Sequence, residues 1–316
     1  MGLPERAPGS FAGGPMNLFC RSAMGVICRT VLCTALVVTS GHAQDSGESQ
    51  PGRQPVGMVP QPCPPPLELP AAARELLTEL FLEPRKLTSA DLNRLTNNPQ
   101  FRQFSEANRL RAANDWAGLC RYRTANASAS SAPSGPGVVF MGDSITENWA
   151  LDDPAFFDHG VLGRGISGQT SAQMLVRFRS DVVALRPRTV HILAGTNDIA
   201  GNTGPTSAQD FENNVMSMVE IARANHIRVI LGSIPPAASF NWRPEVDPKP
   251  WIRQLNAWLR AYAARSQVEF IDYYSILAGP SGELRADLSN DGVHPNRSGY
   301  RLMRARVEKE IVGSDR

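Results

Sequence analysis

The stretch VVFMGDSIT, residues 138–146, decides the fold, because it joins an apolar segment to a serine at a sharp turn. Residues 138–141 form a short, continuous apolar run, which is typical of a strand buried on both faces in a parallel sheet. The chain then turns at Gly142 and presents Ser144 at the carboxyl end of that strand, where ligands bind in open α/β sheets. A serine in this position is also a common helix cap. The stretch alone leaves both capping and catalysis open for Ser144.

Short apolar runs alternate with amphipathic helical patterns along the rest of the chain. Further strands are predicted at residues 190–194, 228–231 and 268–271, with helices at about 207–224, 251–262 and 303–311. Thr206 and Gln209 have the spacing of a capping box at the first of these helices. This alternation indicates an α/β fold in which helices cover both faces of a mostly parallel sheet.

The first 43 residues have the layout of a secretory signal peptide. Arg21 and Arg29 precede the apolar run 31–38, and residues 41–43 (Gly-His-Ala) offer small side chains at the cleavage positions. The run is well short of the about 20 residues that a membrane-spanning helix needs. We therefore expect cleavage after Ala43, secretion or export to the periplasm, and no transmembrane segment in the mature chain.

Composition divides the rest of the chain into four segments. Residues 44–69 are rich in Gly, Pro, Ser and Gln, which predicts a disordered linker. Residues 70–124 show a helical pattern whose first apolar face includes Leu80 and Phe81, so we expect a helical N-terminal segment. Residues 125–137 are mostly Ala, Ser, Asn, Gly and Pro, and are predicted to be a second linker. Residues 138–316 form the α/β domain.

Charge and cysteine content argue against several partners. Residues 1–43 hold three of the 32 basic and one of the 30 acidic side chains, so the mature chain carries 29 of each. This balance gives no reason to expect nucleic acid or an anionic membrane as a partner. Cys63 and Cys120 remain after cleavage, and in an oxidising compartment they can pair or stay as free thiols. No Cys-x-x-Cys motif or histidine cluster indicates a zinc site.

Residues 163–168, GRGISG, fit the dinucleotide-binding pattern G-x-G-x-x-G. The acidic residue that should follow about 20 positions later at a strand end is not evident, so we predict no nicotinamide or flavin cofactor. Glycines at these positions do let a backbone N–H point outward with no side chain in the way.

Two later segments place polar side chains after predicted strands. Asn197, in the sequence GTND at 195–198, offers an amide donor suited to a developing oxyanion, although Asn and Asp are also common turn formers. Asp291 precedes His294 by three residues, so its carboxylate can bond one imidazole nitrogen and leave the other for a hydroxyl. A solvated turn before a proline-started helix is the alternative for this second segment.

Taken together, these segments resemble the four sequence blocks of the SGNH (GDSL) hydrolase superfamily in composition and order, over about residues 138–312. The resemblance implies a three-layer α/β/α sandwich with a mostly parallel sheet of about five strands, the flavodoxin-like SGNH fold. It implies a mechanism that needs neither a metal nor an organic cofactor.

The same resemblance assigns roles to site residues. It implies that Ser144 is the nucleophile, that His294 is the general base, and that Asp291 holds the imidazole tautomer. It also implies that Gly168 N–H and Asn197 Nδ2, with the backbone N–H of Ser144, form the oxyanion hole.

Within the superfamily, residues 146–149, 199–204 and 272–274 are similar to secreted bacterial acylhydrolases related to platelet-activating-factor acetylhydrolase and lysophospholipase L1-like esterases. The resemblance implies an exported serine esterase that hydrolyses carboxylic esters through an acyl-enzyme. No long apolar stretch suggests a lipid tunnel, so we expect a short acyl group, such as acetyl on a carbohydrate or lipid. The alternatives are a lysophospholipase or thioesterase-type acyl hydrolase and a non-catalytic glycan-binding module.

Phe240 and Trp242 lie in a proline-rich loop. Their side chains could form a wall of the site or cover the core.

Overall fold

Five strands form one parallel sheet. The structure, a computed structural model, describes residues 57–131, 135–158 and 160–312, so the predicted signal peptide lies outside the described residues. The strands are β1 (Val138–Gly142), β2 (Val161–Gly165), β3 (Thr189–Leu193), β4 (Arg228–Gly232) and β5 (Glu269–Ile271). They pair in the order β2-β1-β3-β4-β5, so the chain changes direction across the sheet between β1 and β3. Ligand sites of such sheets lie outside the carboxyl ends of the strands at this switch point.

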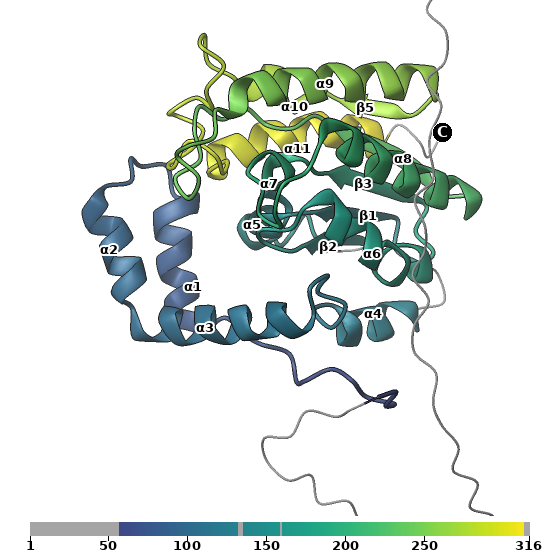
Figure 1. The fold of residues 1–316 in the computed structure, drawn as a ribbon, viewed down its shortest axis with the longest axis horizontal. Coiled ribbons are helices and arrows are strands. Elements are labelled where there is room, and N and C mark those ends of the chain that lie inside the picture. Colours follow the sequence, from purple (N-terminus) through teal and green to yellow (C-terminus); the bar gives the residue numbers. More distant parts are fainter. Residues whose placement is uncertain (1–56, 132–134, 159, 313–316) are drawn as a thin grey trace, which may run out of the picture. The chain divides into compact units, whose positions relative to one another are not determined.

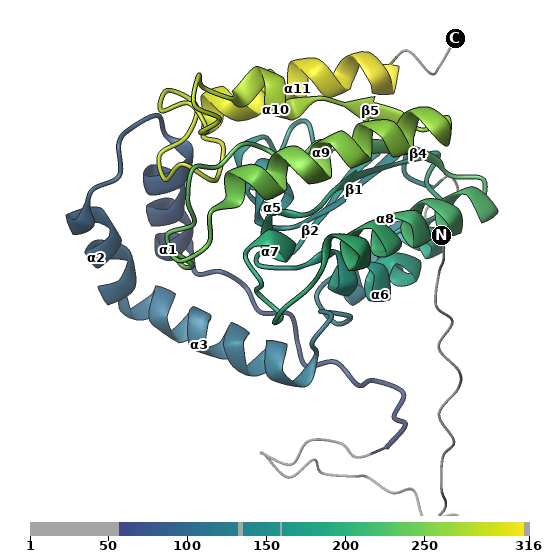
Figure 2. The same ribbon diagram turned by 45° about the horizontal axis from the view of Figure 1, so that its top comes forward.

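Helices cover both faces of the sheet (Figures 1 and 2). One face carries α5 (Ser144–Asp152) and α11 (Arg297–Val312), and the other carries α6 (Ser171–Asp181), α8 (Ala208–Ala224) and α9 (Pro248–Arg265). The shorter elements η2 (Val183–Leu185), α7 (Thr196–Ile199) and α10 (Tyr273–Leu277) lie in the connections. No helix within the described ranges has the length and apolar character needed to cross a membrane.

The strands alternate their side chains between two apolar clusters. Val139 and Met141 of β1 pack in one cluster with α6, α8 and α9, whereas Val138 and Phe140 pack in the other with Trp149 of α5. This alternation follows from the two-residue period of a strand, and burial of both faces explains why the run 138–141 is continuously apolar. The predicted three-layer α/β/α sandwich is confirmed.

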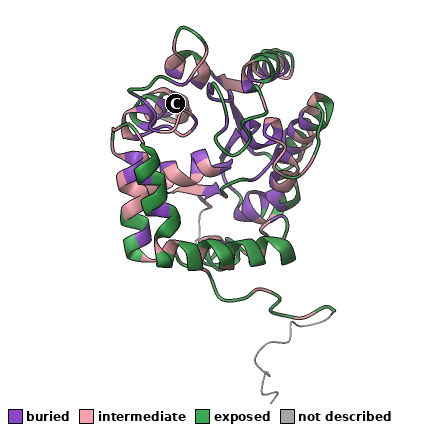
Figure 3. Ribbon diagram, turned by 60° about the vertical axis from the view of Figure 1, so that its left-hand side comes forward, coloured by how far each residue is buried: buried purple, intermediate pink, exposed green. Residues whose placement is uncertain are grey.

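The N-terminal segment folds as helices: α1 (Ala71–Leu77), a π-helical turn η1 (Thr78–Leu82), α2 (Ser89–Asn97), α3 (Pro99–Asn114) and α4 (Arg123–Ser130). Figure 3 shows buried residues gathered in the sheet and exposed ones along the long N-terminal helices, and α3 has no buried residue. Leu82 nevertheless belongs to the same apolar cluster as Phe140 and Trp149. Residues 58–316 accordingly form one compact unit.

The structure differs from the predicted linker at 125–137, because α4 extends through Ser130. Ala and Ser tolerate helical backbone, and tertiary contacts decide the outcome. Asn126 is buried, and its Nδ2 donates to Ser180 O at 3.1 Å and to Asp181 Oδ1 at 2.7 Å. The first linker is also tied to this region, since Cys63 and Cys120 form a disulfide.

The cap of α8 also differs from the prediction by one residue. Ser207, not Thr206, is the N-cap, and it forms a capping box with Asp210 rather than with Gln209. Both pairs have the same spacing, so the sequence pattern alone did not separate them.

The carboxyl end of β2 meets the first turn of α5 with no room for a side chain. A Cβ at Gly165 would lie 2.3 Å from Glu147 N and 2.7 Å from Asp143 O, both of which are backbone atoms that cannot move aside alone. We expect Gly165→Ala to lower the free energy of unfolding by about 3 kcal/mol in urea denaturation. The control is Gly137→Ala, whose Cβ would meet only the flexible end of Arg188 within 3.4 Å. Equal stability of the two variants would contradict the close contact at Gly165.

Candidate active site

Ser144 lies at the junction of β1 and α5. It is the first residue of α5, and the N-cap is Asp143, whose Oδ1 accepts a hydrogen bond from Ile145 N at 2.9 Å. The capping interpretation of Ser144 is therefore wrong, because its neighbour caps the helix. The Ser144 hydroxyl points to the loop before α11, and its Oγ is 2.9 Å from Nε2 of His294.

The loop before α11 holds His294 and Asp291 in a fixed relation. Nδ1 of His294 is 2.7 Å from Oδ2 of Asp291. The other carboxylate oxygen accepts hydrogen bonds from the backbone N–H groups of Val293 and His294 at 2.9 and 2.8 Å. The two oxygens of Asp291 thus have separate roles, since one fixes the turn and the other orients the imidazole. The structure brings Ser144, His294 and Asp291 together in one hydrogen-bonded chain, although 150 residues separate the serine from the histidine.

Asp291 and His294 stabilise each other's charged forms. Burial opposes ionisation of Asp291, but the charge and hydrogen bond of His294, with the backbone N–H groups of the turn, lower the pKa of Asp291 to about 2. Burial would lower the pKa of His294, but the charge and hydrogen bond of Asp291, helped by the charge of Asp143, raise it above 6.5. These shifts favour the ionised form of Asp291 and the protonated form of His294.

The sequence predicts two backbone N–H groups, those of Gly168 and Ser144, as oxyanion donors. Gly168 has φ +80°, a left-handed conformation that favours glycine. Neither Gly168 N–H nor Ser144 N–H donates to an acceptor within the described ranges. Both groups are therefore available to a substrate oxygen.

Asn197 lies beside the same turn, but its amide is already engaged. Its Nδ2 donates to Asp143 Oδ2 at 3.1 Å and to Gln169 O at 3.0 Å, and its Oδ1 accepts from Asn202 Nδ2 at 2.7 Å. Burial raises the pKa of Asp143 to about 6. The predicted oxyanion donor Asn197 is thus bonded to Asp143 next to Ser144, with both amide hydrogens in use. To donate to an oxyanion, Asn197 has to share or release one of these bonds.

Comparison with known proteins identifies the family. Residues 140–302, just over half of the chain, match the model of the GDSL-like lipase/acylhydrolase family. The chain belongs to this family.

Relatives of this GDSL-family chain include esterase TesA of Pseudomonas aeruginosa, which is 31% identical over 171 residues, covering 50% of the chain and 79% of TesA. The lipoprotein YqeF of Bacillus subtilis is 28% identical over 130 residues, and the match spans 35% of the chain and about half, 54%, of that relative. The crystal structure of a GDSL-like lipase from Bacteroides thetaiotaomicron superposes with a TM-score of 0.60 at 45% identity, covering 63% of the chain and 98% of the lipase. Family membership places the chain among the ester hydrolases.

Two residues near Ser144 and His294 were not singled out as site residues from the sequence. Asn202 donates to Gly168 O at 3.2 Å as well as to Asn197, and so links two of the predicted site residues. Phe81 and His294 form a T-shaped ring contact, at 6.2 Å between centroids and an interplanar angle of 85°. Helical periodicity placed Phe81 on an apolar face, which explains its inward direction but not the site that it faces.

The aromatic residues of the proline-rich loop separate into two roles. Phe240 is fully buried in the core, as the covering interpretation predicts. Trp242 stacks on Phe240 at 5.0 Å, keeps 40% of its surface exposed, and lies 6.5 Å from the His294 ring. Its Nε1 donates to Asn202 Oδ1 at 3.0 Å, which fixes the indole beside the site.

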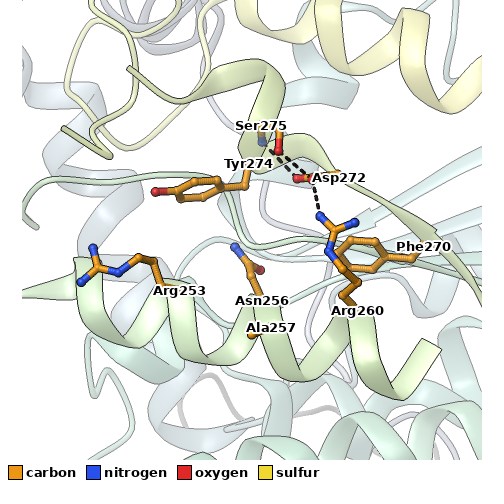
Figure 4. Close-up of a pocket in the computed structure, with 8 residues that line it drawn as sticks. All are labelled: Arg253, Asn256, Ala257, Arg260, Phe270, Asp272, Tyr274 and Ser275. Carbon is orange, nitrogen blue, oxygen red and sulfur yellow. Dashed lines mark hydrogen bonds and ion pairs between the residues drawn. The ribbon is translucent and has the colours of Figure 1, made fainter. Parts of the chain in front are cut away.

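A separate pocket of about 180 Å³ lies between α9 and the β5–α10 connection and does not include Ser144 or His294 (Figure 4). Three of its polar side chains bond one another or the backbone. Arg260 pairs with Asp272, which also caps α10 through Ser275, and Asn256 pairs with both backbone groups of Ile234. These side chains hold α9 and α10 in place, and we assign the pocket no part in the chemistry.

Proposed function

We propose that this chain is an exported serine esterase that hydrolyses carboxylic esters through an acyl-enzyme. The observation that carries the proposal is the hydrogen-bonded chain Ser144–His294–Asp291 in a member of an ester hydrolase family. The order nucleophile, base and orienting carboxylate defines a catalytic triad by geometry.

In the proposed reaction, Ser144 Oγ attacks the ester carbonyl carbon while Nε2 of His294 takes the hydroxyl proton. The carbonyl oxygen becomes an oxyanion, which the N–H groups of Gly168 and Ser144 stabilise, each donor contributing about 3 kcal/mol. Asn197 joins as a third donor when it releases Asp143. His294 then gives its proton to the leaving alcohol oxygen and the acyl-enzyme forms. A water molecule then attacks the acyl carbonyl carbon while His294 takes a proton from it. The bond to Ser144 Oγ breaks, His294 returns the proton to this oxygen, and the carboxylic acid leaves.

We infer that the substrate carries a short acyl group, such as acetyl on a carbohydrate or lipid. Polar side chains lie along one edge of the site: Asn202 bonds Gly168 and Asn197, and Thr203, the next residue, is 3.4 Å from Thr170 Oγ1. Polar side chains at the edge of the site favour a small, hydrogen-bonding substrate such as an acetylated sugar over a long hydrocarbon chain.

Export is part of the proposal. The predicted signal peptide at residues 1–43 supports it, and so does the Cys63–Cys120 disulfide, since disulfides persist in oxidising compartments. The relative YqeF is a lipoprotein, which agrees with a location outside the cytoplasm.

A series of p-nitrophenyl esters from acetate to palmitate, run beside acetylated xylan, tests the proposal. We expect kcat/KM to be highest for acetate or butyrate and to fall at least about tenfold by octanoate. The polar side chains at the edge of the site give a longer acyl chain no favourable contact. Acetate release from acetylated xylan is expected, and EDTA should leave the rates unchanged. A preference for palmitate would favour the lysophospholipase-type alternative. Glycan binding without hydrolysis of any ester would favour the non-catalytic module.

A further inference from the structure

The π-helical turn η1 buries Leu80 and Leu82 but leaves Phe81, between them, outside the core. Leu80 and Leu82 are 0% and 1% exposed, and Leu82 enters the core beside α5. Phe81, between them, belongs to neither apolar cluster of the described residues. It is partly buried, and its ring makes a T-shaped contact with the His294 ring. A large apolar side chain is thus held beside the base of the triad without contributing to the core. Segments of π-helix are often found at functional sites.

Asn290 fixes this turn to the catalytic loop. This residue directly precedes Asp291, and its Nδ2 donates to Leu80 O at 2.8 Å and to Glu83 O at 2.7 Å. Its Oδ1 accepts from the backbone N–H of Arg85 at 3.2 Å. The two carbonyl contacts flank Phe81 in the sequence, so the backbone that carries this side chain is held on both sides.

An ion pair adds a second connection between the same segments. Arg297 at the start of α11 donates to Glu83 at 2.6 Å and to Asp152 at 2.9 Å. In Figures 1 and 2 the α1 end of the N-terminal segment accordingly lies beside the loops that precede α11. The N-terminal segment and the histidine loop therefore form one structural unit, although Phe81 lies outside the residues that match the family.

The chemistry of ester cleavage says which part of the substrate lies next to His294. The imidazolium must protonate the leaving alcohol oxygen, so that oxygen comes within hydrogen-bonding reach of Nε2. The acyl group and its oxyanion lie instead toward Gly168. Side chains that flank His294 consequently face the alcohol part of the ester.

We propose that Phe81 is a specificity-determining residue that lines the subsite for the alcohol part of the ester, beside His294. This inference rests on the proposed function. Trp242 borders the same subsite, with an indole that its stack on Phe240 and its bond to Asn202 immobilise. Two fixed aromatic side chains favour an alcohol with a broad apolar face, such as an aryl group or a sugar ring, over a small aliphatic alcohol.

The test varies the alcohol and the acyl group separately in the full chain. The first ratio, the alcohol ratio, divides kcat/KM for p-nitrophenyl acetate by that for ethyl acetate. The second ratio, the acyl ratio, divides kcat/KM for p-nitrophenyl butyrate by that for p-nitrophenyl acetate. Phe81→Ala should lower the first ratio by about tenfold, because the aryl alcohol loses an apolar contact that ethanol never makes. The second ratio should change by less than about twofold. The hydrolysis rate of the acetyl-enzyme, measured after the burst, should not change, because the alcohol has already left.

Matched variants distinguish a role of Phe81 in binding the alcohol from a role in stabilising the fold. Phe81→Leu keeps apolar volume and should restore part of the alcohol ratio. Phe101→Ala removes a partly buried phenylalanine of α3, elsewhere in the N-terminal segment, and should change neither ratio. An unchanged alcohol ratio in an active, folded Phe81→Ala variant would overturn the inference, as would an equal loss in both ratios. A wild-type protein that hydrolyses none of these esters would contradict the proposed function itself.

Discussion

Ser144→Ala is expected to lower kcat/KM for p-nitrophenyl acetate by a factor of about 10⁴–10⁶. The substitution removes the only oxygen bonded to Nε2 of His294 in the described ranges, and with it the acyl-enzyme route. The N–H groups of Gly168 and Ser144 belong to the backbone and remain in the variant. The residual rate should therefore exceed the uncatalysed rate, because bound substrate can still meet water beside the oxyanion donors.

The stability of the same variant tests the alternative role of Ser144. Loss of an N-cap costs about 1 kcal/mol, which corresponds to a fall of a few degrees in Tm for a chain of this size. Asp143 caps α5, so we expect the Tm of Ser144→Ala to stay within about 1 °C of the wild type. Ser217→Ala in α8, which removes a partly buried hydroxyl far along the chain, is the matched control and should keep full activity.

Two results would contradict the assignment of Ser144. Turnover at the wild-type rate would remove the residue from the nucleophile role. A loss of activity that parallels a clear fall in Tm would mean that the serine supports the helix rather than the chemistry. Trapping of a radiolabelled acetyl group on wild type, and its absence in the variant, gives an independent measurement of the covalent step.

The sheet could be predicted from sequence because its strands are buried on both faces. Residues 138–141 are continuously apolar for that reason, residues 190–194 are apolar except for His191, and each run is followed directly by a polar turn. The contact between Asp291 and His294 could be predicted because the two residues lie three apart, so local geometry alone relates them. The N-cap could not be assigned in the same way, since Asp143 and Ser144 are both good caps and only the backbone position distinguishes them.

The contacts that the sequence did not predict are between distant segments. Asn290 and Leu80 are 210 residues apart, and no local pattern links a loop asparagine to a helix carbonyl. Asp198 is a comparable case: it looked like a turn former, but it is buried and accepts hydrogen bonds from both the N–H and the hydroxyl of Ser171 at the start of α6. In both cases burial of a polar group required a partner, and the fold, not the local sequence, supplied it.

Asp291→Asn is expected to lower kcat by about 10⁴-fold with little change in KM. The asparagine oxygen can still accept from the backbone N–H groups of Val293 and His294, so the turn should persist. Its Nδ2 would then face Nδ1 of His294 and donate to it. That arrangement places the imidazole proton on Nε2, the atom that has to accept the proton of Ser144. Ser289→Ala, which removes a hydroxyl bonded to Oδ1 but leaves the carboxylate, should retain far more activity.

The pH profile distinguishes this electronic effect from simple misplacement of the histidine. In the wild type, kcat/KM should rise with pH as His294 loses its proton, with a midpoint above 6.5 because Asp291 and Asp143 raise its pKa. In Asp291→Asn the largest raising influence is gone and burial remains, so the midpoint should move to lower pH while the plateau falls. Asp143 is present in both proteins, so the difference between their profiles isolates Asp291, which cannot itself titrate here with a pKa of about 2. A lower plateau with an unmoved midpoint would show that the carboxylate positions the ring but does not set its charge.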